Sequence, residues 1–67
     1  MLPLAAIERI ARKGGAERLS ADAIVELRRT VEEIADELAA EAALAARHAH
    51  RKTIKQEDIK LIAGKIL

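Results

Sequence analysis

The stretch from Ser20 to His50 constrains this chain more than any other part of its 67 residues. Residues 21–49 contain no glycine and no proline, and ten of these 29 residues are alanine, the best helix former. Ser20 precedes them with a hydroxyl that can accept a hydrogen bond from a free amide of the first helical turn. The sequence therefore predicts one long helix.

Apolar side chains recur along this helix at alternating steps of three and four residues, which places them on one face. They are Ile24, Leu27, Val31, Ile34 and Leu38. A helix of 29 residues is about 44 Å long, whereas a compact monomer of 67 residues is about 28 Å across. The helix is too long for a globule of its own chain, so we expect this apolar stripe to be the core of a dimer.

Length and composition narrow the remaining possibilities. The chain predicts a single domain over residues 1–67 that buries only about 60% of its unfolded surface. It has no cysteine and no aromatic residue, so its core is aliphatic and oligomerisation is the usual way for such a core to gain burial.

We find no catalytic motif and expect neither an enzyme nor a cofactor. We also expect no metal site, because His48 and His50 would point to different faces of a helix.

Neither a signal peptide nor a membrane span is expected. The apolar run near the start is interrupted by Glu8 and Arg9. No stretch approaches the roughly 20 apolar residues that cross a bilayer. We expect a cytoplasmic protein.

Charge is divided unevenly along the chain, although its net value is only +1. Residues 1–21 carry a balance of +2, residues 22–44 a balance of −5, and residues 45–67 a balance of +4. The two ends are basic and the middle of the long helix is acidic.

Two shorter helices flank the long one. Pro3 suits a first turn, Leu4, Ile7 and Ile10 follow at helical spacing, and Glu8 is expected in the first turn. Gly14-Gly15 should end this helix, one of the two glycines being left-handed. A third helix is expected over residues 56–66, after a connector that contains Lys52-Thr53-Ile54.

Pairing two long helices antiparallel would bring the first connector of one chain beside the second connector of its partner. Each end of such a dimer would gather basic side chains twice by symmetry. They are Arg18, Arg51, Lys52 and Lys55.

The chain resembles an archaeal histone in several segments. Residues 46–59, which include the string Arg51-Lys52-Thr53-Ile54-Lys55-Gln56-Glu57-Asp58-Ile59, resemble that family's signature, and residues 15–20 and Leu2-Pro3-Leu4 resemble other segments of it. The resemblance implies an all-α histone fold that forms an antiparallel handshake dimer. It also implies sequence-nonspecific binding and compaction of duplex DNA in archaeal chromatin, and hence a chromosome-associated protein.

Non-specific DNA binding needs cations and hydroxyls that neutralise phosphates and release counterions. The residues expected to contact DNA are Arg9, Arg12, Lys13, Arg18, Arg51, Lys52, Thr53 and Lys55. Arg9 and Arg18 are expected to reach toward the minor groove, as arginines do in histone octamers.

The resemblance assigns further roles to the second half of the chain. It implies an intrachain salt bridge between Arg47 and Asp58. It also places Ala45, His48, Asp58 and Leu61 where two dimers meet, and the small Ala45 predicts weak stacking there.

Two alternatives remain open. One is a histone-fold interaction subunit that heterodimerises and uses little DNA contact, which the acidic long helix favours. The other is a plain coiled-coil dimer, which leaves the basic connectors unexplained. The sequence leaves homodimer, heterodimer and higher stacking undecided.

Overall fold

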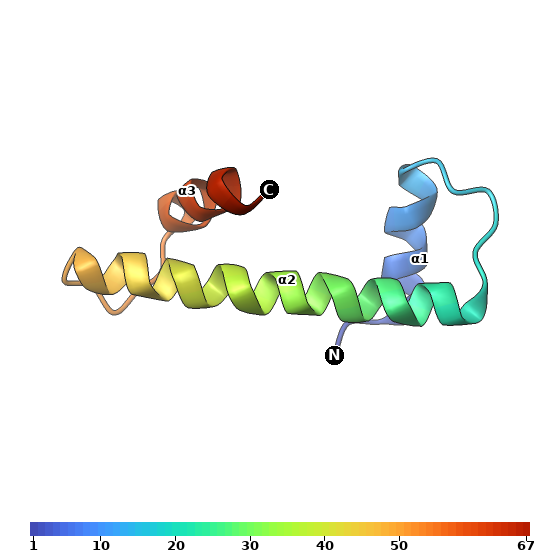
Figure 1. Cartoon of the computed structure of the whole chain (residues 1–67), viewed down its shortest axis with the longest axis horizontal. Coiled ribbons are helices and arrows are strands. Elements are labelled where there is room, and N and C mark those ends of the chain that lie inside the picture. The colour runs from blue at the N-terminus through green and yellow to red at the C-terminus, as the bar shows by residue number, and fades with distance from the viewer. The chain divides into compact units, whose positions relative to one another are not determined.

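The computed structural model describes residues 1–67 as three helices and no strand (Figure 1). Helix α1 covers Leu4–Lys13, α2 covers Ala21–His48 and α3 covers Gln56–Ile66. The all-α prediction and the order of short, long and short helices are confirmed. None of the three is both long and apolar enough to cross a membrane.

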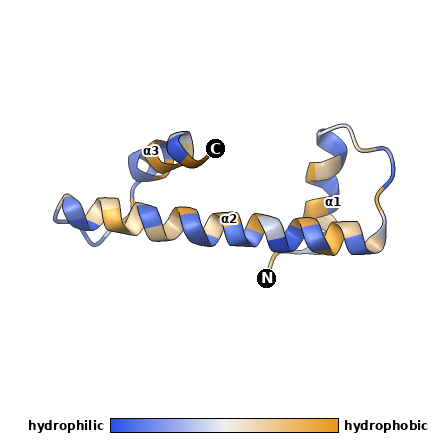
Figure 2. Cartoon of the chain, in the orientation of Figure 1, coloured by the Kyte–Doolittle hydropathy of each residue, from blue (hydrophilic) through white to orange (hydrophobic).

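Helix α2 begins as its sequence predicts. The Ser20 hydroxyl accepts a hydrogen bond from the Ala23 amide at 3.2 Å, which satisfies one free donor of the first turn. The pKa of Asp22 lies below its ordinary value, chiefly because its carboxylate accepts a hydrogen bond from Ser20 and also from backbone amides of this turn. Figure 2 shows hydrophobic and hydrophilic segments alternating along α2, as in an amphipathic helix.

The chain divides into two compact units, Met1–Glu33 and Ile34–Leu67, which are called here the first unit and the second unit. The boundary falls within α2, so each short helix packs on its own part of the long one. A single domain over the whole chain remains a prediction.

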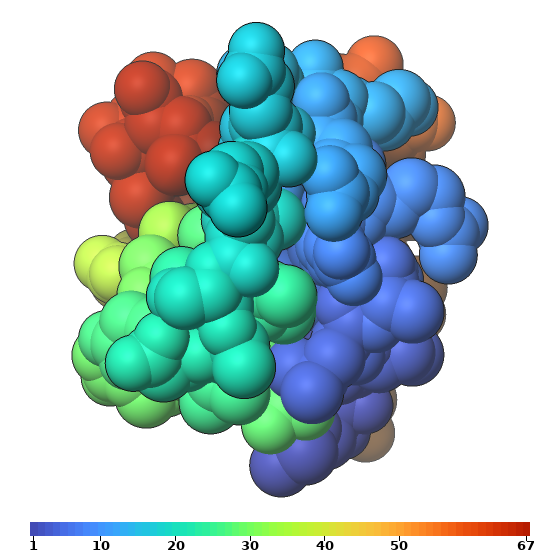
Figure 3. Space-filling model, turned by 90° about the vertical axis from the view of Figure 1, so that its right-hand side faces the viewer, coloured from blue at the N-terminus to red at the C-terminus, as the bar shows by residue number.

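In the first unit, α1 lies against the beginning of α2 (Figures 1 and 3). Ile7 is its buried side chain, with 1% of its surface exposed. The segment before α1 is held to α2 through the backbone of Leu2. Its amide donates to Glu32 Oε2 at 3.1 Å and its carbonyl accepts from Arg28 Nη1 at 3.5 Å.

Helix α1 ends at the two glycines, as predicted. Gly14 is right-handed and closes the helix, and Gly15 takes the left-handed value φ 104°. The prediction for Glu8 is wrong, because α1 begins at Leu4 and its first turn holds no acidic residue. Glu8 lies one turn later and forms an ion pair with Arg12 instead.

In the second unit, α3 packs on the last part of α2 through small and aliphatic side chains. Ala42 and Ala46 of α2 and Ile62 of α3 are buried. Between the helices, His50 adopts a left-handed backbone with φ 60°. The Arg51 amide donates to the Ala46 carbonyl and the His50 amide to the Arg47 carbonyl, both at 2.9 Å. These two bonds close α2 with a Schellman motif.

Few apolar side chains are buried by the chain itself. Only four hydrophobic residues are buried, and two of them are alanines. The predicted stripe of α2 is half-buried at each of its positions, which are Ile24, Leu27, Val31, Ile34 and Leu38. Ten large hydrophobic residues are exposed, among them Ile10 at 59% and Leu61 at 55%. The chain therefore leaves more large hydrophobic side chains exposed than it buries.

Candidate nucleic-acid interface

In the first unit, basic side chains lie on α1 and on the connector that follows it. Arg9, Lys13 and Arg18 are exposed, and none of them forms an ion pair. Their charged groups can therefore reach a ligand without breaking a contact of the chain.

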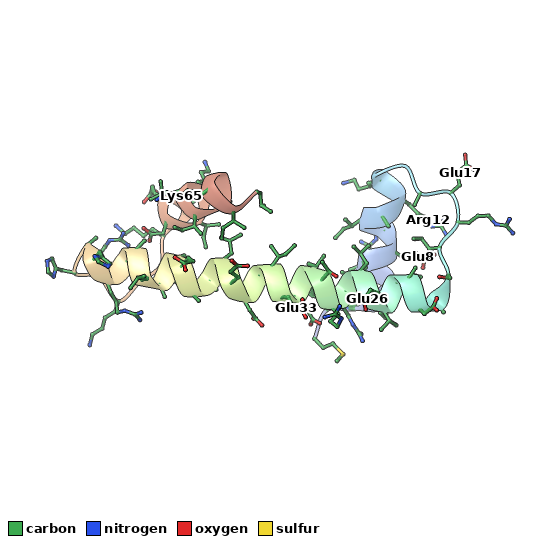
Figure 4. All side chains as sticks on the ribbon, viewed as in Figure 1. Glu8, Arg12, Glu17, Glu26, Glu33 and Lys65 are labelled. Carbon is green, nitrogen blue, oxygen red and sulfur yellow. The ribbon has the colours of Figure 1, made fainter.

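Arg12 differs from these residues because its guanidinium is already used. Nη2 donates to Glu8 Oε1 at 2.8 Å, and Nη1 donates to the Glu17 carbonyl at 3.1 Å. Figure 4 labels Glu8 and Arg12 on α1 and Glu17 on the connector that follows it. Arg12 thus ties the connector to α1, and only part of its donor set remains for a phosphate.

In the second unit, Arg51 and Asp58 form a two-pronged ion pair between the connector and α3. Arg51 Nη2 donates to Asp58 Oδ1 at 2.8 Å, and Nη1 donates to Oδ2 at 3.0 Å. Nη1 also donates to the Thr53 carbonyl at 2.8 Å, and the Lys55 amide donates to Asp58 Oδ2 at 2.8 Å. One carboxylate therefore holds the connector and the first turn of α3 together.

These contacts change the acidity of the pair. The pKa of Asp58 falls to about 2, first because of the hydrogen bond from Arg51 and then because of the bond from the Lys55 amide. The pKa of Arg51 is raised above its ordinary value by the same carboxylate. Asp58 is only 7% exposed, so the charged form is held in a nearly closed site.

The predicted salt bridge between Arg47 and Asp58 is wrong. Arg47 forms none of the four ion pairs of the chain and is exposed near the end of α2. Arg51 takes its place because it lies on the connector, close enough to bond Thr53 and Asp58 together. Arg51 is therefore less free for DNA than predicted.

The remaining predicted contacts of this connector are available. Lys52, Thr53 and Lys55 are exposed, and neither lysine forms an ion pair. The eight predicted DNA-binding residues thus separate into six with uncommitted side chains and two arginines, Arg12 and Arg51, that shape the connectors.

The residues predicted for a dimer–dimer contact lie in different environments. His48 and Leu61 are exposed, Ala45 is half-buried, and Asp58 is buried within its own chain. Whether two dimers meet through them stays a prediction.

Sequence reasoning missed an ionic cluster on α2. Arg29 pairs with Glu26 one turn before it and with Glu33 one turn after it; Figure 4 labels both glutamates. The pKa of Arg29 is raised and that of Glu26 lowered by these contacts. Spacings of three and four residues on a helix could have indicated these pairs. They neutralise part of the acidic middle of α2.

The chain closely matches known proteins over most of its length. The family described as “Histone-like transcription factor (CBF/NF-Y) and archaeal histone” matches residues 1–62. The A subunit of the archaeal histone HAN1 from Thermococcus zilligii is 52% identical over 60 residues, which are 90% of each chain. The probable archaeal histone 3 of Methanocaldococcus jannaschii is 46% identical over 59 residues, which are 88% of each chain. The chain therefore belongs to the family of histone-like transcription factors and archaeal histones.

Proposed function

We propose that this chain binds duplex DNA without sequence preference and compacts it on the chromosome as a histone-fold dimer. The observation that carries the proposal is the set of exposed basic side chains, free of ion pairs, in both connectors. They are Arg18 in the first connector and Lys52 and Lys55 in the second. The names of the two archaeal histone relatives support the same class of function.

The apolar side chains that the chain leaves uncovered support a dimer. Half-buried and exposed apolar side chains along α2 need further cover, and a second α2 supplies it with the same chemistry. An antiparallel pair of these helices would set the first connector of each chain beside the second connector of its partner. The whole chain and its partner would then act as one domain.

The chemistry of the connectors fits phosphates better than base edges. Lys52 and Lys55 supply mobile positive charges, and the exposed Thr53 supplies a hydroxyl. Such contacts position a protein on duplex DNA but do not read its sequence. Arg51 and Asp58 keep this group of side chains in one place by fixing the connector.

The decisive experiment titrates the protein against random-sequence duplex DNA at several salt concentrations. We compare the wild type with Lys52→Ala/Lys55→Ala, which keeps the backbone bond from residue 55 to Asp58. We expect the variant to bind at least about tenfold more weakly on every sequence, with the salt slope reduced by about 0.9 for each phosphate that it no longer neutralises.

Lys60→Ala/Lys65→Ala is the matched control, because it removes two exposed lysines from α3 and none from a connector. It should keep most of the affinity. Equal losses in the two double variants would contradict the placement of the interface, and a wild type that binds no DNA at low salt would contradict the function itself.

A second candidate is a protein-interaction subunit that pairs with a related chain and makes little DNA contact. The balance of −5 in residues 22–44 favours it, because acidic surface repels phosphates. The Thermococcus relative is named as one subunit of its histone, which also fits pairing with a different chain. Mass measurement of the purified chain, by itself and with related chains, separates a homodimer from a subunit that needs another partner.

A further inference from the structure

The end of α2 carries a cationic hollow that the proposed function leaves unused. The hollow is open, has a volume of about 300 Å³ and is lined by Leu44, Arg47, His48 and His50. Arg47 is charged, and the two histidines can become so. None of the three takes part in an ion pair of the chain, and no carboxylate lines the hollow.

His50 has a left-handed backbone conformation, which glycine adopts more readily than other residues. It is the only residue other than glycine with a positive φ, and it closes the Schellman motif of α2. Histidine adopts this conformation more readily than most residues, but still at a cost that glycine avoids. Strain of this kind clusters at ligand-binding positions. At this position the histidine places an imidazole beside the hollow, whereas a glycine would place no side chain there.

The surroundings of the hollow permit a bound anion. The last carbonyls of α2 accept hydrogen bonds from the amides of residues 49–51, which reduces the negative charge of the helix end. The other charged groups of this part of the chain are Glu41 on α2, Arg51, Lys52 and Lys55 on the connector, and Glu57, Asp58, Lys60 and Lys65 on α3. The acid that is buried among them, Asp58, is neutralised by Arg51. The hollow thus keeps an excess of positive charge.

We propose that this hollow binds a phosphate group of duplex DNA, through Arg47 at any pH and additionally through His48 and His50 once they are protonated. The inference rests on the proposed function and adds to it a contact that strengthens as pH falls. Histidine is the side chain that ordinarily changes charge between about pH 8 and 5. Phosphate oxygens accept charge-assisted hydrogen bonds from imidazolium and guanidinium groups.

A second dimer is the competing occupant, because resemblance places His48 at a dimer–dimer contact. The lining argues against it. Leu44 is the single large apolar side chain there, and no acid is present to pair with three cationic groups. A phosphate supplies the missing negative charge.

The test compares the wild type, His50→Asn and Lys60→Gln in titrations against random-sequence duplex DNA at about pH 8 and pH 6, at constant ionic strength. Asparagine tolerates the left-handed backbone but gains no charge. We expect the gain in DNA affinity from pH 8 to pH 6 to be about three- to tenfold smaller in His50→Asn than in the wild type. This is the size of effect expected when each chain of a dimer loses one exposed ionic contact. Lys60→Gln, which removes a charge on α3, should keep the wild-type gain.

A second variant separates loss of phosphate binding from misfolding. His50→Gly suits the left-handed backbone, so it should unfold at a higher temperature than the wild type and still show the same reduced gain at low pH as His50→Asn. Equal gains in the wild type and His50→Asn would overturn the proposal. The proposal would also be overturned if His50→Asn formed smaller assemblies by light scattering but kept the wild-type gain in DNA affinity at low pH. The hollow would then be a contact between proteins.

Inorganic phosphate gives a readout that does not depend on DNA. Added at about pH 6, it should shift the ring signals of His48 and His50 in the NMR spectrum of the whole chain. If the wild type binds no DNA at either pH, the proposed function fails by itself. Phosphate-induced shifts would then still support an anion site in the hollow, and their absence would overturn it.

Discussion

Asp58 links three parts of the second unit through one side chain. Its carboxylate accepts from the Arg51 guanidinium on the connector and from the Lys55 amide at the start of α3, the helix to which it belongs. Arg51 extends the link to the Thr53 carbonyl. The connector that presents the predicted phosphate-binding lysines is therefore fixed by ionic and backbone contacts, with little apolar packing of its own.

The depressed pKa of Asp58 makes this link sensitive to acid. The carboxylate form is favoured in the folded chain, so its contribution to stability is complete above the ordinary aspartate value near 4 and is lost as pH falls toward about 2. We expect the thermal midpoint of the wild type to fall more steeply between pH 5 and pH 2 than that of Asp58→Asn. Circular dichroism at 222 nm measures both curves.

Asp36→Asn is the control for this acid dependence, because Asp36 is exposed and forms no ion pair. Its curve should follow the wild type. Parallel curves for the wild type and Asp58→Asn would show that the pair contributes nothing that depends on the charge of Asp58.

At the scale of the helix, the sequence predicts the elements well. Alanine content, the Ser20 cap and the glycine pair correctly place the ends of α1 and α2 to within one or two residues, because local chemistry determines them. The third helix is predicted with its observed bounds.

The partner of Asp58 is not predictable in the same way. Arg47 and Arg51 are both basic and both near the end of α2, and only the path of the connector decides which one reaches the carboxylate. That path depends on the left-handed turn at His50, which sequence spacing does not reveal. The six predicted DNA-binding residues with uncommitted side chains can be proposed from sequence, whereas the bonds that occupy Arg12 and Arg51 appear only in three dimensions.

Helix α2 should lose its partner when its apolar stripe is charged. Val31 is half-buried on that stripe, so Val31→Lys would place an ammonium where an antiparallel α2 is proposed to pack. We expect the variant to sediment as a monomer and to lose most of its helical signal, because an isolated helix depends on packing for most of its stability. Sedimentation equilibrium and circular dichroism measure the two effects.

Glu37→Lys is the matched change, since Glu37 is exposed on α2 and forms no ion pair. It introduces the same ammonium on the same helix away from the stripe. A Glu37→Lys variant that also dissociates would indicate that charge on α2, and not burial of its stripe, governs pairing.

The small buried core and the uneven distribution of charge both indicate that the chain needs a partner chain. The four buried hydrophobic residues, Ile7, Ala42, Ala46 and Ile62, are too few and too small to hold 67 residues folded against the loss of chain entropy. The basic connectors are separated along the chain by the acidic middle of α2, so the proposed DNA-binding surface would form only when a second chain is added. One partner would thus complete both the core and the interface.

Folding should therefore depend on protein concentration. For a dimer that unfolds to separate chains, a tenfold increase in concentration stabilises the folded state by about 1.4 kcal/mol, which raises the thermal midpoint by about 5 °C for a dimer of this size. Calorimetry across a hundredfold range of concentration measures the shift. A midpoint that stays constant, together with a monomeric mass, would mean that one chain folds alone, and the proposed pairing of α2 helices would then be wrong.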